Sequence, residues 1–159
     1  MRRVEWRDQD TENCSIGRTL DVVGKPWVLQ ILREAFRGLQ RFADIQQHLG
    51  ISEPVLSRRL AGLVEAGLLE QRRYRQPGQR GRSEYHLTDG GRELFPLLAA
   101  LKGWGDVHLA DPEGPATVHL HRGCGRPVGV ELRCAAGHRI RAVSEIVVQP
   151  GPAARPLVG

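Results

Sequence analysis

The 159-residue sequence has few cysteines and no long apolar run, and each shortage excludes a class of protein. Three cysteines, Cys14, Cys124 and Cys134, are too few and odd in number for a disulfide-stapled fold, which leaves thiol or metal chemistry open. No stretch approaches the roughly 20 apolar residues of a membrane-spanning helix. The charged N-terminus lacks the apolar core of a signal peptide, so we expect a cytoplasmic protein without a membrane partner.

The sequence also lacks motifs that carry catalysis. It contains no Gly-rich phosphate loop and no recognisable nucleophile motif, and His86, His108 and His119 occur singly at strand or helix positions. We therefore expect no enzymatic activity and no required cofactor.

Arginine is the residue type that the sequence has in excess. Lys and Arg together number 23 against 18 Asp and Glu, for a net charge of +5, yet lysine occurs only as Lys25 and Lys102. The planar arginine fork pairs with phosphates and with guanine edges. With 40% hydrophobic and 26% charged residues, the composition is that of a soluble globular protein with one core and an appendage.

Helical periodicity begins soon after the N-terminus. Apolar residues recur at helical spacing over 17–36, which predicts one or two helices broken once at "GKPW", with Pro26 in the first turn of the second. A short stripe predicts a helix over 42–49 that ends at Gly50. The next helix is the best marked, because Ser52 serves as N-cap, Pro54 lies in the first turn and the apolar stripe ends at Gly67.

Strand patterns follow, over 68–74 and 83–88, and together they predict a hairpin. Thr88 or Asp89 then caps a last helix that fades near Ala110. From Asp111 onward Pro and Gly mark a linker, and short alternating segments between about 115 and 149 predict strands before a frayed end. The predicted fold is mainly α with a small β wing, divided into an arm (1–12), a winged helix-turn-helix domain (13–110) and a β-rich extension (111–159).

The basic hairpin and the helix before it predict DNA binding. The second helix of a helix-turn-helix motif enters the major groove with its N-terminal part, and Arg58 is the first candidate for base readout there. The stretch "RRYRQPGQRGRSEY", residues 72–85, holds five arginines that a phosphate backbone would neutralise; of Arg72 and Arg73, which alternate across a strand, only one should face DNA. The predicted DNA contacts are Arg41, Ser52, Pro54, Ser57, Arg58, Arg59, Arg75, Arg80 and Arg82.

Two other interpretations stay open. The arginine-bearing helix also fits an ordinary amphipathic helix with solvated charges. The scaffold also fits a winged-helix protein-interaction module that does not bind DNA, because a fold does not dictate its function.

Over roughly residues 13–105 the sequence resembles the HxlR-type transcriptional regulators, a bacterial winged-helix family related to the MarR group. The resemblance implies a homodimer, built from the N-terminal segment and the helix after the wing, on a near-palindromic operator. Its effector is unknown from sequence. The matching residues are Cys14, Gly24, Trp27, Ile31, Leu32, Arg33, Glu34, Arg41, Phe42, Leu56, Arg59, Leu60, Gly67, Leu68, Tyr85, Leu87, Thr88 and Gly91.

Apolar residues on one side of the last helix suit a dimer interface, although they could also cap the core of their own chain. The predicted interface residues are Leu94, Leu97, Leu98, Leu101 and Trp104.

Cysteine chemistry has two candidate locations. In some family members a cysteine at the position of Cys14 senses oxidants or electrophiles, and backbone amides at a helix start favour a thiolate; a buried, inert cysteine is the alternative. The tail residues His121, Cys124, Cys134 and His138 have a spacing that resembles a zinc knuckle, but Gly137 stands where a second cysteine of the pair is expected. A small strand appendage with semi-buried cysteines is the alternative to zinc.

Overall fold

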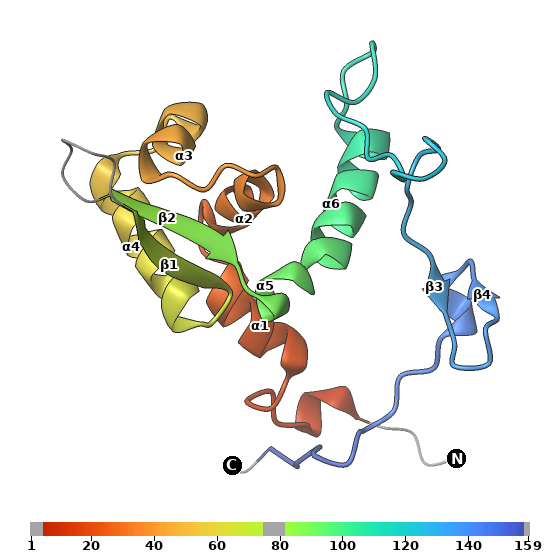
Figure 1. The fold of residues 1–159 in the computed structure, drawn as a ribbon. Coiled ribbons are helices and arrows are strands. Elements are labelled where there is room, and N and C mark those ends of the chain that lie inside the picture. Colours follow the sequence, from red (N-terminus) through yellow and green to blue (C-terminus); the bar gives the residue numbers. More distant parts are fainter. Residues whose placement is uncertain (1–4, 75–81, 158–159) are drawn as a thin grey trace.

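Figure 1 shows a computed structural model of the chain, which describes residues 5–74 and 82–157. The fold is mainly helical with a small β wing, as predicted. None of the helices in these ranges is both long and apolar enough to cross a membrane. The helices and strands of the winged domain are α1 (Ser15–Val23), α2 (Val28–Phe36), α3 (Phe42–Leu49), α4 (Glu53–Glu65), β1 (Leu69–Tyr74), β2 (Arg82–Leu87), α5 (Asp89–Arg92) and α6 (Phe95–His108).

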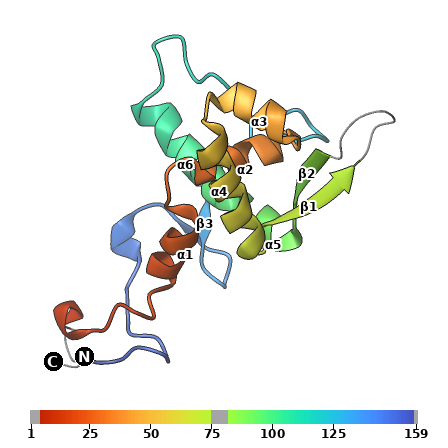
Figure 2. The same ribbon diagram turned by 90° about the vertical axis from the view of Figure 1, so that its left-hand side faces the viewer.

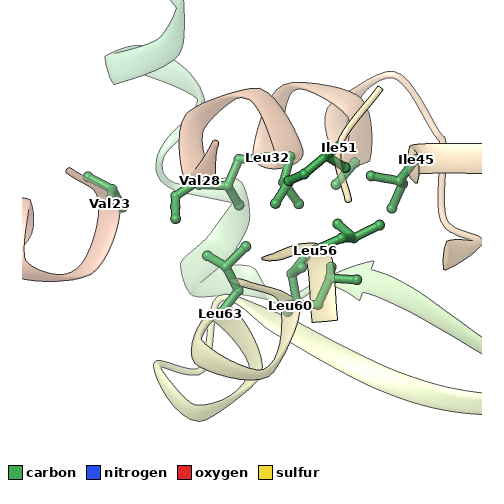
Figure 3. Close-up of a cluster of buried hydrophobic side chains, with 11 residues drawn as sticks. Val23, Val28, Leu32, Ile45, Ile51, Leu56, Leu60 and Leu63 are labelled. Carbon is green, nitrogen blue, oxygen red and sulfur yellow. The ribbon is translucent and has the colours of Figure 1, made fainter. Parts of the chain in front are cut away.

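The core lies between α2, α3 and α4. Figure 3 shows Leu56, Leu60 and Leu63 pointing from α4 toward Val28 and Leu32 of α2. The three α4 leucines are buried and recur every three or four residues, so one helical face carries all of them. Burying each leucine contributes about 1.5–3 kcal/mol, and the shared face fixes the rotation of α4 about its axis.

The break between the first two helices differs from the prediction at Pro26. This proline lies in the turn before α2, which begins at Val28, and not in the first turn of the helix. Trp27 has a left-handed backbone (φ 74°) and so cannot continue a right-handed helix from Pro26 into Val28. The break at "GKPW" is otherwise where the sequence predicts it.

The helix predicted after the wing is divided into α5 and α6. Thr88 caps α5, since its Oγ1 accepts a hydrogen bond from the amide of Gly91 at 3.0 Å. Glu93 and Leu94 separate the two helices, and Pro96 lies in the first turn of α6. A proline without an amide hydrogen favours a helix start there over a continuous helix.

The wing is the antiparallel pair of β1 and β2, in which Leu69 faces Leu87 and Tyr74 faces Arg82. Arg41 adds a bridge to Glu84, and the Tyr85 amide donates to the Gln40 carbonyl at 2.7 Å. The chain segment before α3 is therefore hydrogen-bonded to the base of the wing. Figure 2 shows the wing projecting on the side opposite to α1 and α6.

The C-terminal extension has less regular structure than predicted. Over residues 111–157 its strands are β3 (Leu132–Arg133) and β4 (Arg139–Ile140), which are followed by a short 3-10 helix, η2 (Val143–Glu145). Prolines and glycines at intervals of a few residues interrupt the alternating pattern, so long ladders do not form.

The end of the chain is paired where fraying was predicted. Gln9 forms a bridge with Pro156, and the Asp10 amide donates to the Arg155 carbonyl at 2.9 Å. The N-terminal arm, with its 3-10 helix η1 (Trp6–Asp8), therefore lies beside the last described residues, as Figure 1 shows.

Gly91 gives a test of the packing between α5 and the wing. A Cβ at Gly91 would lie 2.1 Å from the Leu68 carbonyl oxygen, whereas one at Gly90 would lie 3.9 Å from its nearest neighbours. We expect Gly91→Ala to lower the free energy of unfolding by about 2 kcal/mol, because the backbone at Leu68, just before β1, must move. Urea denaturation measures this, with Gly90→Ala as the matched control. Equal stability of the two variants would contradict the packing described.

Candidate nucleic-acid interface

The N-terminal half of α4 presents an exposed polar surface. Ser52 is the N-cap residue, as predicted, but its side chain makes no capping hydrogen bond and stays exposed. Pro54, Ser57 and Arg58 are exposed as well. Since the leucine face of α4 is buried, this surface is what the helix presents to a partner.

The two adjacent arginines of α4 have different surroundings. Arg58 is exposed and makes no ion pair or hydrogen bond with any described residue. Arg59 is half-buried, and its Nε donates to the Pro26 carbonyl oxygen at 3.0 Å. Arg59 therefore ties α4 to the α1–α2 turn, and Arg58 is the arginine whose guanidinium is available to a ligand.

A concave surface that encloses a volume of about 460 Å³ is lined by residues of α3, α4 and the wing. It brings together three of the predicted DNA contacts, Arg41, Ser57 and Arg82. Asp44 and Glu53 line the same surface, and neither was predicted to take part. Carboxylates repel phosphates but accept a hydrogen bond from the cytosine amino group, so their place in a DNA-binding surface would be against base edges.

An ion pair joins the segment before α3 to β2 of the wing. Arg41 Nε lies 3.2 Å from Glu84 Oε1, and His86 Nε2 lies 3.4 Å from Glu84 Oε2 without forming a hydrogen bond. Tyr85 lines the concave surface from the same strand, and burial raises the pKa of its phenol above the usual 10.0. The phenol thus keeps its proton at neutral pH and can act as a hydrogen-bond donor to an anion. Tyr85 was matched in the sequence only as a family residue.

The wing arginines are divided between its two faces. Arg72 pairs with Glu70 on the face that also carries Glu84, so its charge is already compensated. Arg73 lies on the other face, opposite Ser83, and forms no ion pair with the described residues. Arg82 is exposed at the start of β2. Arg75 and Arg80 lie outside the described residues.

A buried carboxylate joins α2 to α3. Glu34 is fully buried, and its Oε1 accepts hydrogen bonds from Arg33 Nε at 2.6 Å and Arg37 Nη1 at 3.4 Å. Its Oε2 lies 2.8 Å from His48 Nδ1 without the geometry of a hydrogen bond, and it has no hydrogen-bond partner among the described residues. His48 is in the last turn of α3, so this contact helps to hold α3 at a fixed angle to α2. The sequence marked Glu34 as a family residue without indicating this role.

The five residues predicted at a dimer interface are not equivalent. Leu94 and Leu98 pack against the core of their own chain, so they cap it. Leu97, Leu101 and Trp104 are exposed, Trp104 at 59%. Helix α1 also carries exposed apolar residues, Ile16 and Leu20 among them. An apolar surface therefore remains on α1 and α6, on the side away from the wing.

All three cysteines are exposed and form no disulfide. Cys14 is the N-cap residue of α1, as predicted. In the extension, His121 Nδ1 lies 3.2 Å from Cys124 Sγ, while the amide of Cys134 donates to the His138 carbonyl. No three His, Cys, Asp or Glu side chains in residues 5–74 and 82–157 gather closely enough to hold a metal ion. The predicted four-ligand zinc site is therefore not formed in this structure.

Proteins of similar sequence or structure are helix-turn-helix regulators and candidate transcription factors. An HTH-type transcriptional regulator of Mycobacterium tuberculosis is 43% identical over 142 residues, which cover 89% of this chain and 88% of the relative. The crystal structure of a candidate transcription factor, PA1607, is 35% identical with a TM-score of 0.78, covering 88% of this chain and 96% of that one. The oxidised redox regulator HypR is 28% identical with a TM-score of 0.55, and covers 62% of this chain and all of its own.

The family assignment rests on the winged domain. The HxlR-like helix-turn-helix family matches residues 22–113, which contain α2 to α6 and the wing. The relatives are transcriptional regulators and not enzymes, and the exposed half of α4 lies where such a motif contacts DNA. The chain is accordingly a transcriptional regulator with a helix-turn-helix DNA-binding domain, and it belongs to the HxlR-like family.

Proposed function

We propose that the protein acts as a homodimer that recognises a near-palindromic operator with two copies of α4. The observation that carries this proposal is that Arg41 before α3, Ser57 on α4 and Arg82 on the wing line one concave surface, while the next residue of α4, Arg58, is exposed. The α4 residues have the length and position to reach base edges, while Arg41 and Arg82 flank them where a phosphate backbone would pass.

The division of tasks follows from geometry. Arg58 faces outward near the N-terminal half of α4, the part of a recognition helix that enters the major groove, and an arginine there can contact guanine through two hydrogen bonds. Glu53, the first residue of α4, offers an acceptor to a cytosine amino group. Arg82 and the wing supply contacts to phosphates or the minor groove, which add affinity without choosing a sequence.

The exposed apolar residues of α1 and α6 support the homodimer. In a single chain, more than half of the surface of each of three apolar residues is exposed: Trp104, Val107 and Ile16. While they remain in water, their apolar area contributes no hydrophobic stabilisation. Covering them with the same surface of a second copy gives a two-fold dimer. The two-fold axis of such a dimer matches the two-fold symmetry of a palindromic operator.

Cys14 is the proposed site of redox control. It is exposed at the start of α1, next to the proposed dimer surface, so a change at its sulfur would reach the arrangement of the two protomers. HypR, a redox regulator with solved oxidised and reduced forms, has the same fold at 28–29% identity. Oxidation of Cys14 to a disulfide requires a second thiol, which is either Cys14 of the other copy, Cys124, Cys134 or a small thiol.

Substitutions at Arg58 and Arg82 separate base readout from phosphate contact. We expect Arg58→Ala to weaken operator binding by about 2 kcal/mol and to reduce discrimination among operator variants. We expect Arg82→Ala to weaken binding to all sequences alike and to lower the salt slope by about 1. Fluorescence anisotropy with the DNA upstream of its own gene, at several salt concentrations, measures both.

The exposed Arg122 of the extension provides the control, since Arg122→Ala removes the same charge outside the proposed DNA-binding surface. If the wild-type affinity did not depend on salt, the chain would be a protein-interaction module instead.

A substitution at Trp104 tests whether the protein assembles as a dimer. Trp104→Glu should turn the dimer into a monomer at micromolar concentration, because two carboxylates would face each other across the two-fold axis, weakening association about a hundredfold or more. Sedimentation velocity gives the mass. Val143→Glu, at a residue 85% exposed in the extension, is the control and should stay dimeric. A monomeric wild-type protein would disprove the homodimer.

The response to an oxidant tests the proposed role of Cys14 in redox control. Diamide removes two hydrogens from two thiols and leaves a disulfide, and we expect it to change the DNA retardation of the wild-type protein. Cys14→Ser should bind the operator normally and show no response. A variant with both Cys124→Ser and Cys134→Ser tells whether the tail supplies the second thiol. A Cys14→Ser protein that still responded would move the sensor elsewhere.

A further inference from the structure

We propose that the cavity between α2 and α6 is a binding site for a small amphipathic organic anion that weakens DNA binding. The binding step stands independently of the function proposed above, whereas its effect on DNA rests on that function. The cavity has a volume of about 660 Å³, within the range of pockets that hold drug-sized ligands.

Three parts of the chain build the walls of the cavity. Helix α2 and helix α6 form two sides, and Ala116, Thr117 and His119 of the extension form the third. The His119 ring lies 5.4 Å from the Phe95 ring, which in turn lies 5.3 Å from the Phe36 ring. This stack of three rings holds the extension against the ends of α2 and α6, so the third wall is fixed in position.

The lining has an apolar part and a basic part. The aliphatic side chains come from both helices and include Leu29, Leu98 and Leu101. The basic part consists of Arg33, Arg37 and Lys102, against the carboxylates of Asp106 and, behind the wall, Glu34. Three cations face two carboxylates, so an acidic group gains attraction on entering while its hydrocarbon body covers the leucines. This combination selects an apolar carboxylate or sulfonate over a neutral or cationic molecule.

The cations of the cavity also hold the helix-turn-helix motif. Arg33 and Arg37 both bind Glu34 Oε1, and Oε2 of the same carboxylate faces His48 of α3. An anion in the cavity competes with Glu34 for the two arginines, and the carboxylate must then change its position. Its contact with α3 changes with it, so α3 and α4 leave the arrangement that fits DNA. A chain of direct contacts thus joins the cavity to the DNA-binding surface.

The third wall lies beyond the family domain. The family match ends at residue 113, before Ala116, and HypR covers 62% of this chain. The Mycobacterium tuberculosis relative and PA1607 align with 89% and 88% of it, which includes most of the extension. The cavity is therefore a feature of chains that carry the extension, and a regulator without one has no equivalent third wall.

Titration of the full-length protein with anilinonaphthalene sulfonate, a fluorescent amphipathic anion, tests the binding site. We expect saturable binding of one probe per chain. Thr117→Trp fills the cavity from the extension without touching the core and should weaken binding about tenfold or more. Val143→Trp adds the same side chain elsewhere in the extension and should bind as the wild type does. Equal affinity of Thr117→Trp and wild type would place the probe elsewhere and overturn the proposal.

Two further measurements test the chemistry of the occupant. Lys102→Gln should weaken binding of the anionic probe roughly fivefold, while binding of the uncharged N-phenylnaphthylamine stays unchanged. Equal losses for both probes would overturn the preference for an anion. Binding that falls as the protein concentration is raised through its dimerisation range would show that a second copy fills the cavity, and would also overturn the proposal.

The effect on DNA is measured separately by anisotropy with and without the probe. We expect the probe to weaken operator binding by the wild type, and His48→Gln to bind the probe normally while losing this effect. Probe binding without any effect in the wild type would overturn the regulatory half. A protein that bound the probe but no DNA at all would disprove the proposed function and leave the ligand site standing.

Discussion

The burial of one leucine face of α4 is the constraint on which the DNA-binding surface depends. Leu56, Leu60 and Leu63 have no exposed area to speak of, and together they set how α4 is turned about its own axis. With that face inside, Ser57 and Arg58 must point outward, so the position of the functional side chains follows from the hydrophobic effect. No specific interaction of Arg58 itself is needed to place it.

The core has one charged exception, which bears on regulation. A buried carboxylate costs several kcal/mol unless it is paired, and Glu34 is paired with Arg33 and with Arg37 at the end of the same helix, while its other oxygen lies 2.8 Å from His48 of α3. Small solutes do not compete for the hydrophobic contacts between α2 and α3, whereas a small anion can compete with Glu34 for its arginines. The place where the motif is held by charge is thus also the place where a charged ligand can act on it.

Sequence patterns predicted those parts of the molecule in which neighbouring residues decide the structure. The helices before the wing, the N-cap at Ser52 and the wing itself were predicted because caps, glycines and apolar stripes act locally. The division of the last helix after Leu94 also had a local signal, the proline at position 96. The continuous apolar stripe led instead to the prediction of one helix. The partners of Arg59 and Glu34 lie on other elements, and no local pattern reveals them. The cavity needs residues 29 to 119, so only the folded chain shows it.

The pairing of the two chain ends ties the extension down at a second point. Besides the bridge between Gln9 and Pro156, the Asn13 side chain donates to the Ala153 carbonyl, which brings the end of the chain next to Cys14. The extension is consequently a closed loop that starts at α6 and returns to α1, and it is less free than a tail of equal length. A chemical change at Cys14 therefore takes place beside the last described residues of the extension as well as at the start of α1.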